Sequence, residues 1–123
     1  MRLIQAIAKH QESWIGVDLD GTLAHYDGWK GSEHIGDPVP CMLFRVKKWL
    51  AEGRRVKIFT ARASDPVAVK AIKAWLVEHD IGGLEVTNVK DYAMIELWDD
   101  RAVQVVENTG MSIEQFIKNG GKL

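Results

Sequence analysis

The clearest candidates for chemistry are two aspartates, Asp18 and Asp20, which follow an apolar stretch and precede Gly-Thr-Leu. In a strand, positions i and i+2 face the same side, so both carboxylates can reach one pocket where the strand ends. Open α/β sheets keep their chemistry at that edge. One carboxylate could act as a nucleophile while the other moves a proton. Two closely spaced negative charges also attract a hard divalent cation, and Mg²⁺ bound in this way usually works with phosphate.

Two simpler interpretations of this stretch compete. It resembles the start of a calcium-binding loop, but that loop needs an oxygen ligand where the chain has Thr22 and a glycine where it has Leu23. The loop would also need a glutamate at its last position, which here is Trp29. The other alternative is a structural turn closed by an aspartate side chain.

Polar residues also follow two later apolar stretches. Thr60 and Arg62 come after the first, where a hydroxyl, backbone N–H groups and a guanidinium could hold an anion. A helix-capping threonine and a solvated arginine are the alternative. Asp99 and Asp100 follow the second stretch and could add metal ligands, or they could form a surface turn with a salt bridge to Arg101.

Helical and strand patterns alternate along the chain. The apolar stretches predict five strands, at Trp14–Leu19, Val56–Thr60, Leu84–Thr87, Met94–Trp98 and Val103–Val106. Helices are predicted over residues 2–10, from Pro38 after an Asp37 cap, from Pro66 after an Asp65 cap, and after Ser112. This alternation implies a mostly parallel sheet with helices on both faces. We therefore expect one α/β domain over residues 1–123, a Rossmann-like three-layer sandwich with a five-stranded sheet.

The order of these motifs resembles the haloacid dehalogenase (HAD) superfamily of phosphatases and phosphotransferases, from about Trp14 to Asn108. The stretch from Asp18 to Leu23 matches the first motif of that family residue for residue. Thr60 fits the second motif, Lys90 fits the third, and Asp99-Asp100 fits the paired-acid form of the fourth. The Asp-Asp-Arg form is similar to small phage-type members and to the 3′-phosphatase domains of polynucleotide kinases.

The resemblance implies a mechanism. Asp18 would attack phosphorus and form an aspartyl-phosphate, and Asp20 would protonate the leaving oxygen and then activate water. Mg²⁺ would be held by the Asp18 carboxylate, the Asp20 carbonyl and Asp99, with Asp100 as a further ligand or a partner of the ligands. The chain is thus expected to be a magnesium-dependent phosphohydrolase that cleaves phosphomonoesters. A phosphotransferase, or a non-catalytic phosphate-binding or assembly module that keeps the fold, is the alternative.

The phosphoryl oxygens would be bound by Thr60 and Lys90, with Arg62 adding a bidentate contact. Lys90 would also neutralise charge on Asp18. Family members usually carry a helix between this lysine and the fourth strand, whereas here few residues separate Lys90 from Asp99. The segment must therefore be extended if Lys90 is to reach the pocket, or else another lysine takes the role.

The spacing of the motifs leaves no room for a cap domain. Between Asp18 and Thr60, the predicted helix leaves only residues 24–37, enough for a hairpin or flap. An open site suits a large substrate such as a phosphorylated nucleic-acid end, unless a neighbouring subunit closes the pocket over a small one such as a nucleotide. Tyr26 and Trp29, with the histidines at positions 25 and 34, could contact a base or sugar by stacking. The two aromatic side chains could instead pack on their own domain, and the two histidines could be solvated loop residues.

Composition bounds the remaining choices. At 123 residues, 46% hydrophobic and 27% charged, the chain is typical of one globular domain. A net charge of −1 gives no general attraction to nucleic acid or to an anionic membrane. No apolar run could span a membrane and Met1–His10 lacks a signal-peptide pattern, so we expect a cytoplasmic protein, which could form a homo-oligomer. The single cysteine, Cys41, is expected to be a buried and inert thiol.

Overall fold

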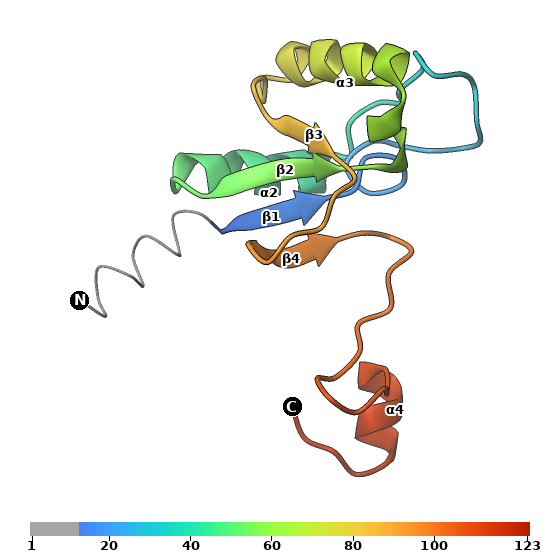
Figure 1. Cartoon of the computed structure of the whole chain (residues 1–123), viewed down its shortest axis with the longest axis vertical. Helices are drawn as coiled ribbons and strands as arrows, with labels where there is room; N and C mark the ends of the chain where they lie inside the picture. The colour runs from blue at the N-terminus through green and yellow to red at the C-terminus, as the bar shows by residue number, and fades with distance from the viewer. Residues whose placement is uncertain (1–12) are drawn as a thin grey trace.

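Four parallel strands form the central sheet (Figure 1). They are β1 (Trp14–Val17), β2 (Arg55–Phe59), β3 (Glu85–Thr87) and β4 (Met94–Trp98), in the order β3-β2-β1-β4. This computed structural model describes residues 13–123, so the helix predicted over residues 2–10 lies outside the described residues. The α/β class and the parallel sheet are as the sequence predicts.

The helices α2 (Pro40–Ala51) and α3 (Pro66–Glu78) pack on one face of the sheet. Alternate strand residues, Ile15 and Val17 on β1 and Val56 and Ile58 on β2, share one core with both helices. The helices contribute the apolar stripes that the sequence predicts, chiefly Met42, Val46, Trp49, Ile72, Trp75 and Leu76. Burial of these stripes is the main force that fixes both helices to the sheet.

The prediction of helices on both faces is wrong for the part of the chain that the structure describes. The steps from β1 to β2 and from β2 to β3 run in the same direction across the sheet, and right-handed crossovers then place both helices on the same face. The next step, from β3 to β4, reverses direction with only residues 88–93, which form no helix. Residues 13–123 therefore show two layers, the sheet and its helices, instead of three.

The predicted start of α2 is also wrong. The helix begins at Pro40, and Val39 is its N-cap residue without a side-chain cap. Pro38 instead forms an antiparallel bridge with Ala24, supported by hydrogen bonds from His25 N to Asp37 O (2.8 Å) and from Val39 N to the Leu23 carbonyl (2.8 Å). These contacts close the base of the segment 24–37, hereafter the flap. The segment is thus a loop closed at its base by a single bridge, without paired strands, and this closure delays the helix by two residues.

Residues Val103–Val106 do not form the predicted fifth strand. The sheet has four strands, and Val105 makes only an isolated bridge to Ser112. The chain turns after β4 and leaves the sheet, and the short helix α4 (Ile113–Lys118) lies apart from it (Figure 1). Val103 and Val105 are exposed, so their alternation does not mark a buried strand.

Cys41 is exposed, so the prediction of a buried thiol is wrong. The buried side of α2 is defined by Met42, Val46 and Trp49, and position 41 falls on its solvent side. An apolar neighbourhood in sequence therefore does not bury a residue that is out of phase with the helical stripe. Over residues 13–123, no helix is both long and apolar enough to cross a membrane.

Candidate active site

Asp18 follows directly after β1, at the edge of the sheet where β4 also ends. Its backbone N–H donates to the Trp98 carbonyl at 2.9 Å, which continues the β1–β4 pairing past the end of the strand. This places Asp18 beside the turn that carries Asp99 and Asp100. One carboxylate oxygen from each of the three residues lies within 4.8 Å of the others. The structure thus brings together the carboxylates of three of the four aspartates that the sequence assigns to a metal.

A tight turn after β1 connects this cluster to β4. Gly21 has a left-handed backbone (φ +89°), which glycine adopts without strain. The Thr22 hydroxyl donates a hydrogen bond to Asp100 Oδ1 (3.1 Å) and accepts one from the Asp100 backbone N–H (3.0 Å). Thr22 therefore fixes Asp100 relative to the turn that carries Asp18.

Burial and the neighbouring carboxylates raise the pKa of Asp18 to about 7. Burial is the largest cause, followed by a hydrogen bond with Asp100 and the negative charges of Asp99 and Asp100. A divalent cation would remove this repulsion, and carboxylate oxygens are the ligands that Mg²⁺ prefers. The donor set therefore fits the metal that the sequence predicts.

The metal-free protein is expected to lose stability as the pH rises from the unfolded-state value of 3.8 to about 7. In this range the folded chain keeps a proton on Asp18 that the unfolded chain has released, so stability falls with pH. One proton gives at most about 1.4 kcal/mol per pH unit, and solvent screening at the partly exposed carboxyl reduces the total loss over the range. Thermal unfolding of chelator-treated protein across this pH range measures the loss.

The Asp18→Asn variant provides the reference for this measurement because asparagine does not titrate. Aspartates 27, 65 and 91, whose pKa values are lowered, titrate in both proteins and cancel in the difference. The difference in stability between the two proteins should therefore change with pH and then level off above about 7. A flat difference would contradict the perturbed Asp18.

Asp20 lies in the same cavity but is held by an arginine. Arg62 Nε donates to Asp20 Oδ2 and Arg62 Nη2 donates to Asp20 Oδ1, both at 2.9 Å. Arg62 Nη1 donates to the carbonyls of His34 (2.8 Å) and Ser32 (3.3 Å) in the flap. The guanidinium also stacks over Trp29, with Cζ 4.8 Å from the ring centre. Arg62 lines the cavity as predicted, yet most of its donors are engaged by the protein itself.

Thr60 lies at the end of β2, where it lines the cavity and is buried. Its hydroxyl accepts from Arg62 N at 3.2 Å and caps the short 3₁₀ turn η1 (Ala61–Ser64). The capping role that the sequence left open is therefore present. A hydroxyl that accepts one hydrogen bond can still donate its own proton, so the cap and a phosphate contact are compatible.

Lys90 is not among the residues that line the cavity. The segment after β3 has no helix and ends in a turn at residues 92–93, and Asn88 lines the cavity in place of the lysine. Further along, Asp91 accepts from Trp14 Nε1 at 2.8 Å, which ties this segment to the start of β1. Lys90 thus lies exposed in the connection between β3 and β4. Asn88 was missed in the sequence, although its place directly after a predicted strand was the available signal.

The cavity around these groups has a volume of about 560 Å³, within the range of small-molecule sites. Three aromatic side chains line it, Phe59 from β2 with Tyr26 and Trp29 from the flap. Tyr26 and Trp29 are 50% and 60% exposed, so neither is packed into the domain core. Arg101 completes the cationic part of the wall with Arg62.

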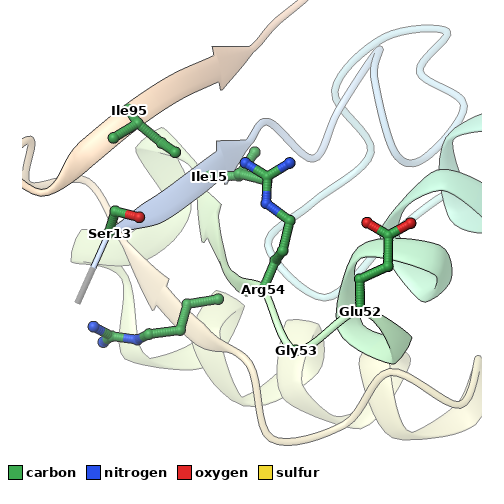
Figure 2. A pocket seen from close by; sticks show the side chains of 7 residues that line it. Ser13, Ile15, Glu52, Gly53, Arg54 and Ile95 are labelled. Carbon is green, nitrogen blue, oxygen red and sulfur yellow. The ribbon is translucent and has the colours of Figure 1, made fainter. Parts of the chain in front are cut away.

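A second cavity, of about 230 Å³, lies at the opposite end of β1 (Figure 2). Its lining includes Ser13, Ile15 and Ile95, with Glu52 and Arg54 from the turn after α2. It contains one carboxylate and no acidic cluster, and it lies at the amino ends of the strands. The chemistry-bearing residues are therefore at the carboxyl edge, where open α/β sheets place their sites.

Comparison with known proteins supports the fold alone. No family model matches the chain, and no curated protein matches it. A solved structure of a conserved protein from Bacteroides thetaiotaomicron is similar, with a TM-score of 0.58 and 21% sequence identity. The match covers 89% of this chain and 92% of that one. The α/β arrangement thus occurs in a second protein of similar extent.

Proposed function

We propose that the protein is a magnesium-dependent phosphohydrolase that cleaves phosphomonoesters through an aspartyl-phosphate on Asp18. The observation that carries this proposal is the convergence of Asp18, Asp99 and Asp100 at the carboxyl edge of the sheet, with Asp20 in the same cavity. A site that binds a neutral ligand through hydrogen bonds does not need three carboxylates so close together. Such a cluster is suited to a cation and, through it, to a phosphate dianion.

Each side chain has a distinct role in the proposed reaction. An Asp18 oxygen attacks phosphorus while the bond from phosphorus to the leaving oxygen breaks, and Asp20 supplies the proton to that oxygen. Asp20 then takes a proton from the water that hydrolyses the aspartyl-phosphate. Mg²⁺, held by Asp18, Asp99 and the Asp20 carbonyl with Asp100 as a ligand or partner, would neutralise charge on the phosphoryl group.

The phosphoryl oxygens would be bound by the Thr60 hydroxyl and by cations near it. Arg62 and Arg101 line the cavity, whereas Lys90 does not. The proposal therefore assigns Thr60 first and keeps Arg62 and Lys90 as secondary contacts, because the Arg62 guanidinium already bonds Asp20 and the flap and Lys90 does not line the cavity. An arginine can bind two phosphoryl oxygens at once, which a lysine cannot.

Nucleotides and nucleic-acid 3′ ends are the proposed substrates. Tyr26 and Trp29 present exposed rings in the cavity that holds Asp18, and such rings stack on bases. We place the protein in the cytoplasm and leave open a second subunit over the cavity. The alternative is a non-catalytic phosphate-binding module, in which the ion pair between Asp20 and Arg62 has a purely structural role.

Phosphate release distinguishes these proposals. The substrates would be p-nitrophenyl phosphate, a panel of nucleotides and 3′-phosphorylated oligonucleotides, each with Mg²⁺ and with chelator. We expect release that requires Mg²⁺ and binding of beryllofluoride to Asp18 as an acyl-phosphate mimic. Binding of nucleotides with no release and no beryllofluoride adduct would instead support the phosphate-binding module.

A further inference from the structure

Arg62 follows β2 and contacts both the Asp20 side chain and the flap, two groups that precede it by 42 and 28 positions in the sequence. It is only 8% exposed, and four hydrogen bonds fix its guanidinium. Two of these bonds go to the Asp20 carboxylate, and two go to backbone carbonyls of the flap, at Ser32 and His34. One guanidinium thus holds the Asp20 carboxylate and the flap backbone together.

The geometry of the link is specific to a guanidinium. Its planar fork matches the two carboxylate oxygens at equal distances of 2.9 Å, and its third nitrogen is left to reach the flap. The stack over Trp29 adds a contact with a flap side chain on the face of the same plane. The Arg62 backbone is fixed in turn by its N–H bond to Thr60 Oγ1 (3.2 Å). A lysine in this place could bond one of these acceptors, but it could not bond both Asp20 oxygens and the flap carbonyls together.

We propose that Arg62 is a positioning residue that couples closure of the flap to the orientation of Asp20. With the flap closed, the carbonyls of Ser32 and His34 hold the guanidinium, and the guanidinium holds the Asp20 carboxylate at the cavity. With the flap open, the guanidinium loses these acceptors and Asp20 loses its fixed orientation. The segment that carries Tyr26 and Trp29 thereby controls the group assigned to proton transfer. The kinetic part of this inference rests on the proposed function.

Hydrogen exchange of the flap tests the coupling without any assay of activity. The reporter amides are those of His25 and His34, which donate to Asp37 O and Gly31 O within the flap. We expect Asp20→Asn and Arg62→Lys each to speed their exchange by about tenfold or more while β1 and β2 amides stay protected. An Asp20→Asn variant with unchanged exchange in the flap would overturn the proposal.

Arg45 provides the matched control. It also stacks on a tryptophan, with Cζ 4.7 Å from the Trp98 ring centre, and its hydrogen bond goes to Met42 within α2. Arg45→Lys should therefore leave flap exchange unchanged. If Arg45→Lys and Arg62→Lys gave the same change, the effect would be general loosening and the proposal would be wrong.

Steady-state kinetics provide the second readout. In Arg62→Lys we expect kcat to fall by about 10- to 100-fold while KM changes by less than about threefold, because the positioning of Asp20 is lost and not substrate binding. A rise in KM with unchanged kcat would make Arg62 a substrate-binding residue and would overturn the coupling. If the wild-type protein releases no phosphate, the proposed function fails while the exchange experiment still decides the role of Arg62.

Discussion

Asp18→Asn is expected to reduce Mg²⁺-dependent phosphate release by at least about 10³-fold, because it removes the attacking oxygen and a metal ligand together. The same change should stabilise the metal-free protein above neutral pH. Asp18 is partly buried beside two other carboxylates, and its ionised form is disfavoured there, as its pKa of about 7 shows. An amide of the same shape carries no charge and avoids this repulsion.

The opposite signs of these two effects make the prediction specific. A variant that lost activity by misfolding would also lose stability, whereas Asp18→Asn should lose activity and gain stability in chelator. Phosphate release and thermal unfolding, both at about pH 8, measure the two effects on the same samples. The matched control is Asp27→Asn, which makes the same chemical change in the flap at a residue paired with Lys30 at 2.9 Å. Retained release in Asp18→Asn would exclude Asp18 as the nucleophile.

The sequence predicts the fold well wherever a local pattern decides the structure. The stripe of α3 is buried at Ala68, Ile72, Trp75 and Leu76 as its periodicity requires, and Asp65 caps the helix through the N–H of Val67. These features depend on neighbours within one or two turns. Val103–Val106 shows the limit, since an apolar alternation forms a strand only if a partner strand lies beside it.

The candidate site also has a part that the sequence predicts and a part that it does not. Asp18, Asp99 and Asp100 meet because parallel strands end at one edge, a rule that can be applied to the sequence. The ion pair between Asp20 and Arg62 depends instead on a backbone turn after β2 and on two flap carbonyls. Carbonyls leave no signature in a sequence, so their contacts could not be predicted. Lys90 illustrates the same limit, because the sequence of an irregular segment does not reveal which of its residues faces the cavity.

Gly21→Ala is expected to move the Asp100 carboxylate out of the acidic cluster. It should cost little more stability than a glycine-to-alanine change at another position with the same backbone conformation. A Cβ at Gly21 would lie 2.6 Å from Asp100 Oδ2 and 2.8 Å from its Cγ, so the carboxylate must move away. This movement also breaks the hydrogen bonds between Asp100 and Thr22. Losing one ligand or its partner typically weakens metal binding by about 10- to 100-fold, and phosphate release should fall with it.

Gly83→Ala separates this steric effect from backbone strain. Gly83 has φ +88°, nearly the same as the +89° of Gly21, but a Cβ there meets no atom within 4 Å. Both variants should therefore lose about 1–2 kcal/mol from the left-handed backbone, measured by thermal or denaturant unfolding. Only Gly21→Ala should weaken Mg²⁺ binding in a calorimetric titration, because only its Cβ meets a carboxylate. Equal Mg²⁺ affinity in the two variants would mean that Asp100 neither binds the metal nor orients a residue that does, leaving Asp18 and Asp99 to hold it.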